Sequence, residues 1–80
     1  MAELKAVRDL IRAKYSGLKA LESPIVSEFL VRGFDQKLME LYEDFVRGEC
    51  SLGYLAEQLG ITTWEAYELL EQKGLRTSNL

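Results

Sequence analysis

The chain has no histidine and a single cysteine, Cys50, among its 80 residues. Histidine is the side chain that most often moves protons at neutral pH, and without it Cys50 has no partner that could activate it as a nucleophile. One cysteine can form no internal disulfide, and without histidine it cannot complete a zinc site. No glycine-rich phosphate loop is present either. We therefore expect a protein that is not an enzyme, uses no cofactor or metal and takes no small-molecule substrate.

Long apolar runs are also lacking. No stretch approaches the roughly 18 residues that span a membrane. The first residues, Met1-Ala2-Glu3-Leu4-Lys5, do not resemble a signal peptide. We expect no membrane partner. A lone cysteine also suits a reducing compartment, so we expect a cytoplasmic location.

The charge is distributed unevenly, although the net charge is only −3. Residues 1–19 carry five basic side chains, at Lys5, Arg8, Arg12, Lys14 and Lys19. Residues 49–72 carry none, but they hold five glutamates, at Glu49, Glu57, Glu65, Glu68 and Glu71. The basic end and the acidic end are thus separate in the sequence.

Helical periodicity dominates what is present, and no segment alternates as a strand would. We expect one all-α domain over residues 1–80, with four or five short helices and a C-terminal helix–turn–helix. An amphipathic helix is predicted over residues 1–22, ending near Leu21. Its apolar face comprises Leu4, Val7, Ile11, Tyr15 and Leu18. Residues 76–80 are predicted to form a loose tail.

The central segment, residues 23–48, is predicted to hold two helices. Ser23-Pro24 is a good helix start, and the apolar residues after it should face the core: Ile25, Val26, Phe29 and Leu30. Gly33 fits a helix stop, and Asp35 can cap the next helix with a Phe34–Met39 hydrophobic staple. The alternative is one continuous, kinked helix from Pro24 to Arg47.

The segment 51–75 has the spacing of a helix–turn–helix. Ser51 can cap a short helix that ends at Leu59, Gly60 allows a tight turn, and Thr62 with Glu65 forms a capping box for a second helix. Gly74 should end that helix, with the next residue folding back on it. Buried positions are expected at Leu52, Leu55, Ala56, Leu59, Ala66, Leu69 and Leu70.

The same region carries a recurrent motif: Gly48, Ser51-Leu52-Gly53, Ala56-Glu57, Gly60, Trp64-Glu65 and Gly74-Leu75. Over residues 38–76 the chain resembles a small prokaryotic, archaeal or bacterial, helix–turn–helix antitoxin family (VapB-like). The resemblance implies an antitoxin that binds and neutralises a PIN-domain ribonuclease toxin encoded beside it. It also implies autoregulation of the operon through operator DNA.

Two sets of side chains are candidates for these contacts. For DNA they are Thr62, Thr63, Tyr67 and Lys73, at and after the start of the second helix. Glu65, Glu68 and Glu71 on the same helix would oppose a phosphate backbone. For a toxin that holds metal ions in carboxylates they are the cations Arg47, Lys73, Arg76, Lys5, Arg8 and Arg12.

The antitoxin reading has two rivals. One is a helix–turn–helix transcriptional regulator, and the other is an interaction module with no toxin. A second copy of the chain is a further candidate partner, because a domain of this size buries little surface alone.

Overall fold

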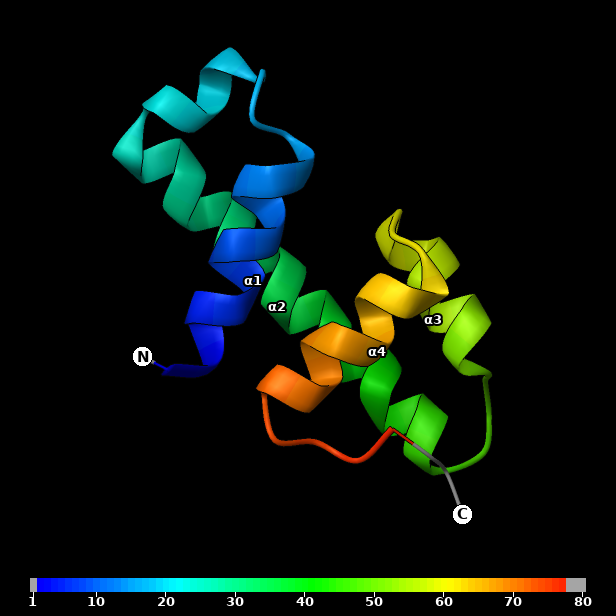
Figure 1. The fold of residues 1–80 in the computed structure, drawn as a ribbon. Coiled ribbons are helices and arrows are strands. Elements are labelled where there is room, and N and C mark those ends of the chain that lie inside the picture. The colour runs from blue at the N-terminus through cyan, green and yellow to red at the C-terminus, as the bar shows by residue number, and fades with distance from the viewer. Residues whose placement is uncertain (1, 78–80) are drawn as a thin grey trace.

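The computed structural model describes residues 2–77, and all the regular secondary structure there is helical. Its elements are α1 (Ala2–Lys14), the short 3-10 helix η1 (Lys19–Glu22), α2 (Pro24–Val46), α3 (Leu52–Leu59) and α4 (Thr63–Gln72) (Figure 1). No strand occurs within residues 2–77, so the prediction of an all-α chain is confirmed.

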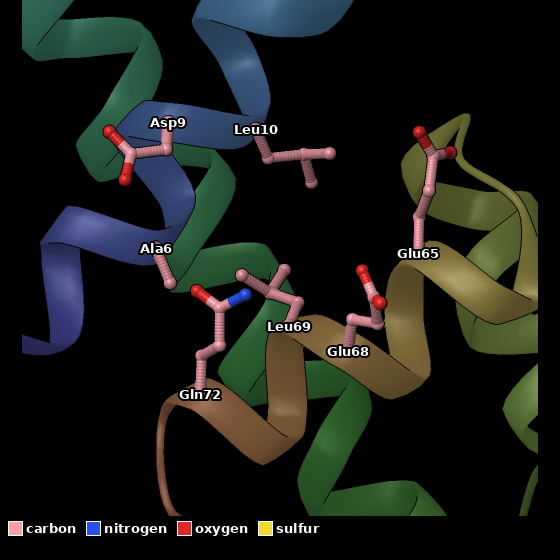
Figure 2. Close-up of a pocket in the computed structure, with 7 residues that line it drawn as sticks. All are labelled: Ala6, Asp9, Leu10, Glu65, Glu68, Leu69 and Gln72. Atoms are coloured by element: carbon pink, nitrogen blue, oxygen red, sulfur yellow. The ribbon is translucent and has the colours of Figure 1, made fainter.

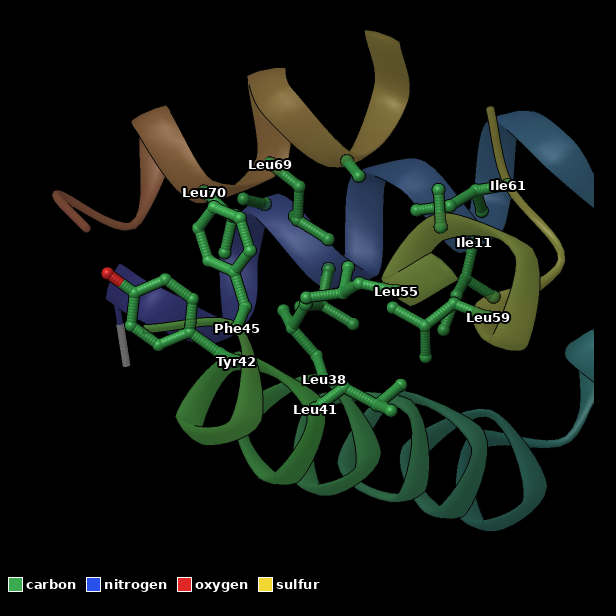
Figure 3. Packing of buried hydrophobic residues seen from close by; sticks show 14 of the residues in the cluster. Ile11, Leu38, Leu41, Tyr42, Phe45, Leu55, Leu59, Ile61, Leu69 and Leu70 are labelled. Atoms are coloured by element: carbon green, nitrogen blue, oxygen red, sulfur yellow. The ribbon is translucent and has the colours of Figure 1, made fainter. Parts of the chain in front are cut away.

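The long helix α2 organises the packing. The buried cluster takes residues from all four α-helices, and Figure 3 shows Leu38 and Leu41 of α2 directed at Leu55 and Leu59 of α3. Ala56 and Ala66 are both buried, which allows α3 and α4 to approach closely. The buried residues are Ala6, Val7, Ile11, Val31, Leu38, Leu41, Tyr42, Phe45, Leu55, Ala56, Leu59, Ile61, Ala66, Leu69 and Leu70.

The ends of α3 and α4 follow the sequence closely. Gly60 adopts φ 71°, and the N–H of Ile61 donates to the Ala56 carbonyl at 3.0 Å. Thr62 and Glu65 form the expected capping box, with reciprocal bonds of 2.8 and 3.1 Å. At the end of α4, the N–H of Leu75 donates to the Leu70 carbonyl at 2.9 Å. These local predictions are confirmed, because capping bonds satisfy groups that the helix itself cannot.

The first helix is shorter than predicted. It ends at Lys14 rather than near Leu21, and a turn follows in which the N–H of Leu18 donates to the Tyr15 carbonyl. Ser16 and Gly17 are weak helix formers, so the helix ends where the core contacts of Ile11 stop supporting it. Lys19 therefore lies outside the helix that carries Lys5 and Arg12.

The predicted break at Gly33 is wrong, and the alternative of one continuous helix is correct in its span. Gly33 lies inside α2, and the helix start and staple proposed around Asp35 do not form. Val31 and Leu38 are buried on either side of Gly33, and burial of such side chains outweighs the cost of about 1 kcal/mol for a helical glycine. Asp35 pairs with Lys73 of the α4 end instead.

The residues expected to bury the start of α2 are exposed. Ile25 and Phe29 are 69% and 71% exposed, and Val26 and Leu30 are also open. Because α1 stops at Lys14, it does not extend over this part of α2, which lies at the far end of the molecule from α3 and α4 (Figure 1). We call the resulting depression the hairpin groove; it is lined by Tyr15, Leu18, Phe29, Leu30, Gly33 and Phe34, over buried Ile11.

Candidate protein-binding surfaces

The outward side of α4 combines aromatic rings with carboxylates. Trp64, Glu68 and Glu71 recur at i, i+4 and i+7, opposite the buried side that holds Ala66, Leu69 and Leu70. We call Trp64, Tyr67, Glu68 and Glu71 the α4 face. Trp64 is 63% exposed and stacks on Tyr67 with ring centroids 5.6 Å apart. The local sequence therefore presents a large apolar side chain to solvent beside two acidic ones.

The carboxylates of the α4 face are not neutralised. Within residues 2–77, neither Glu68 nor Glu71 forms an ion pair, and Glu71 accepts a hydrogen bond from the Tyr67 hydroxyl at 2.8 Å. That bond and the nearby charge raise the pKa of Tyr67. Glu65 differs, because it caps α4 and also accepts from Lys14 at 2.8 Å. These bonds hold the pKa of Glu65 below its ordinary value, so it serves the fold rather than the surface.

An acidic cleft of about 280 Å³ lies between α1 and α4. Figure 2 shows Glu65 and Glu68 along its α4 side, with Leu10 and Leu69 between the two helices. Asp9 of α1 also lines it and pairs with Lys5 at 3.0 Å. Because Asp9 and Glu65 are paired with lysines of the same chain, Glu68 is the one carboxylate of this cleft without an ion pair in residues 2–77.

The four DNA candidates are not presented together. Thr62 and Thr63 are exposed at the start of α4, and Tyr67 lies one turn further along. Thr62 already accepts a hydrogen bond from the Glu65 N–H. Lys73 sits beyond the other end of α4, where its side chain is only 4% exposed and its ammonium lies 2.5 Å from Asp35. Its charge is thus directed at α2 rather than outward.

The three cations at the C-terminal end are largely engaged within the chain. Arg47 pairs with Asp44 at 2.8 Å and with Glu49 at 3.3 Å, and these contacts raise its pKa. Arg76 donates to the Val46 carbonyl, and its own carbonyl accepts from the Tyr42 hydroxyl at 3.0 Å. Arg76, the first residue of the predicted tail, is therefore held at the end of α2. Residues 78–80 of that tail lie outside the described residues.

The three cations of α1 share one side of that helix but differ in their contacts. Lys5 pairs with Asp9, and Arg8 pairs with Glu28 of α2 at 3.1 Å. Arg12 is exposed and makes no ion pair in the part of the chain that the structure describes. Of the predicted cations, Arg12 is therefore the one best placed for an outside contact.

Sequence reasoning did not single out the α4 face. Trp64 entered only as part of a motif, and Glu68 and Glu71 only as charges that oppose DNA. The signal that could have found the face is the i, i+4, i+7 spacing of these three residues away from the apolar side. The hairpin groove had no such signal, because its residues carry the periodicity of a buried face.

The remaining reactive groups form no cluster. Cys50 is partly buried beside the Leu41 carbonyl, and burial raises the pKa of its thiol. Residues 2–77 contain no group of three or more cysteine, aspartate or glutamate side chains placed to hold a metal ion. No helix among them is both long enough and apolar enough to cross a membrane.

Comparison with known proteins gives no match. No protein-family model, no curated protein and no solved structure matches the chain. The likeness to VapB-like antitoxins thus rests on the motif residues between Gly48 and Leu75.

Proposed function

We propose that the protein is an antitoxin-type inhibitor, which neutralises a PIN-domain ribonuclease by covering its RNA-binding surface with the α4 face. The observation that carries this proposal is Trp64, which is exposed on α4 beside Glu68 and Glu71, two carboxylates that form no ion pair in residues 2–77. The resemblance of the motif to VapB-like antitoxins suggests a PIN-domain nuclease as the partner, and the α4 face suggests how the chain binds it.

The chemistry of the α4 face resembles that of the nuclease's substrate. Proteins that bind single-stranded nucleic acid use a positively charged groove together with aromatic side chains on which bases stack. Glu68 and Glu71 can take the places of phosphates in such a groove, and the stacked Trp64 and Tyr67 rings can take the place of bases. Tryptophan is also enriched among the residues that dominate binding energy at protein interfaces.

The proposal keeps the helix–turn–helix prediction as a description of how α3 and α4 are connected. α3 and α4 are joined by a tight turn at Gly60, and α4 begins with a capping box, as such units require. As a reader of operator DNA, however, α4 would bring Glu68 and Glu71 toward phosphates while Lys73 is held against Asp35. Only the exposed Thr62 and Thr63 favour DNA, so operator binding is the second candidate function.

The test is a titration of ribonuclease activity. The proposal predicts that the reading frame beside that of this chain encodes a PIN-domain protein. That protein is co-expressed with the chain, purified, and assayed against increasing amounts of wild type, Trp64→Ala and Tyr54→Ala. Tyr54 is the matched control, because it is a half-exposed aromatic on α3 outside the α4 face. We expect Trp64→Ala to weaken inhibition about 30-fold, which corresponds to the roughly 2 kcal/mol of a dominant interface residue. The Tyr54 variant should inhibit as wild type does. A nuclease that elutes apart from the wild-type chain and keeps full activity in its presence would refute the proposal.

A further inference from the structure

The hairpin groove leaves a large apolar surface open at the end of the molecule away from the α4 face. Phe29 is 71% exposed, and Tyr15 and Leu18 line the groove with it from the turn after α1. Ile25, one turn before Phe29 and 69% exposed, extends this apolar surface along the outer side of α2 beyond the groove. Together the open side chains amount to on the order of 500 Å² of apolar surface per chain. A patch of that size is comparable to the largest apolar patch of a typical monomeric protein, and such patches are often functional.

Gly33 indicates what kind of element covers this surface. It lies in the middle of α2, and a Cβ built on it would meet nothing within 4 Å. No contact within the chain therefore requires glycine there, although glycine costs a helix about 1 kcal/mol relative to alanine. A glycine on an exposed helix side lets a second helix approach closely. Ile25, Phe29 and Gly33 follow at i, i+4 and i+8, so they form a single ridge of the kind that packs against another helix.

We infer that this ridge binds the same ridge of a second copy, so that the chain forms a two-fold symmetric dimer through antiparallel α2 helices crossing at Phe29. In that register Phe29 faces Phe29 of the other copy, and the bulky Ile25 faces the other copy's Gly33. Each bulky isoleucine is thus placed against a glycine, and the two phenylalanines are placed against each other. The ridge is complementary to itself, as a two-fold interface requires.

The charges beside the ridge favour a second copy over a strongly charged partner. Glu28 and Arg32 flank Phe29 on one side of α2 and pair with each other at 2.9 Å, and Glu28 also pairs with Arg8 of α1 at 3.1 Å. The Glu28 carboxylate is thus compensated within its own chain, so no charged partner is needed to neutralise it. Further along, Lys37 and Glu40 form another pair of opposite charges. An interface of about 1,000 Å² in total, counting both chains, is at the lower limit of specific complexes, so the dimer is a weak one.

The inference does not depend on the proposed inhibitor function, because it concerns a different surface. Its test is sedimentation equilibrium of the full chain from low to high micromolar concentration. The wild type should change from monomer to dimer over that range. Phe29→Asp and Gly33→Leu should each weaken dimerisation at least tenfold, and Trp64→Ala should leave it unchanged.

Gly33→Leu keeps the result interpretable. Leucine is a far better helix former than glycine, and a Cβ at this position meets no heavy atom within 4 Å, so the variant should melt at a higher temperature as a monomer. Loss of the dimer in a protein that is more stable can come only from the blocked ridge. A wild type that stays monomeric throughout, or a dimer that survives both ridge substitutions, overturns the inference.

Discussion

Lys73 offers the sharpest test of whether a charged side chain that the structure places inside the chain stabilises the fold. Its side chain is 4% exposed and pairs with Asp35, whose side chain is 22% exposed. The pair joins the end of α4 to the middle of α2. We predict that Lys73→Met destabilises the fold, because it leaves the Asp35 carboxylate partly buried without this counter-charge.

The size of the effect follows from the burial. Removing one partner of a fully buried ion pair costs about 3–5 kcal/mol, and the residual exposure of Asp35 reduces this to about 2 kcal/mol. A domain of this length is stable by only about 4–12 kcal/mol, so the melting temperature should fall by about 8–16 °C. Lys5→Met is the matched control, since the Lys5 side chain is 76% exposed in its pair with Asp9. That pair should contribute under about 1 kcal/mol.

Urea unfolding followed by circular dichroism measures both variants, and a third variant completes the comparison. Asp35→Leu combined with Lys73→Met replaces the pair with apolar groups and should recover most of the lost stability. The reasoning is refuted if Lys73→Met costs no more than Lys5→Met. It is also refuted if the double variant is no more stable than Lys73→Met alone.

Three further outcomes follow from the helix ends and the titratable groups. Gly60→Ala should cost about 1–2 kcal/mol in urea unfolding because φ is 71° there, whereas Gly33→Ala should stabilise the dilute monomer by up to about 1 kcal/mol; equal effects at the two sites would contradict the assigned backbone. Lys14 and Thr62 lower the pKa of Glu65 from 4.5, so the stability it supplies is present above pH 4.5 and is lost as the pH falls through the folded-state pKa. The melting temperature of Glu65→Gln should accordingly fall less steeply than that of wild type below pH 4.5, and parallel profiles would argue against the Lys14 contact. Burial and the nearby carboxylates raise the pKa of Cys50 above 9.0, so alkylation by iodoacetamide at pH 8 should be slower than in the urea-unfolded chain; an equal rate would place the thiol in open solvent.

The features that could be predicted well depend only on residues that are close together in the sequence. The turn at Gly60 and the capping box of Thr62 with Glu65 each involve residues within five positions of one another. Glycine alone adopts the required positive φ without strain, and a threonine followed three residues later by glutamate has few other uses. Such signals are local, so they can be interpreted without knowledge of the fold.

The errors concern positions where the outcome depends on distant contacts. Gly33 has the local signature of a helix stop, but α2 continues through it because Val31 and Leu38 are buried against other elements. Phe29 has the spacing of a buried residue, yet it is exposed because α1 ends too early to cover it. Periodicity identifies an apolar side but cannot say whether this chain or another one covers it.

At the candidate site, too, some features could be predicted from the local sequence and others depended on distant contacts. The acidic character of α4 was evident from composition, and it already weakened the case for DNA. That Lys73 is directed back toward Asp35 was not evident, because residue 35 was assigned to a helix start that does not form. The exposed Trp64 became meaningful only once the buried side of α4 was known.

Charge reversal on α4 tests the central claim most directly, because the two candidate functions predict opposite results. Glu68→Lys combined with Glu71→Lys is compared with wild type in two assays, inhibition of the PIN-domain nuclease and binding to the upstream DNA at fixed salt. Glu43→Lys, on the outer side of α2, is the control for a reversed surface charge. If the α4 face covers the nuclease's RNA-binding surface, the double variant should inhibit at least tenfold less well, while the control inhibits normally. Undiminished inhibition by the double variant would contradict the account, whatever its DNA binding, because two added lysines attract phosphate on any exposed helix.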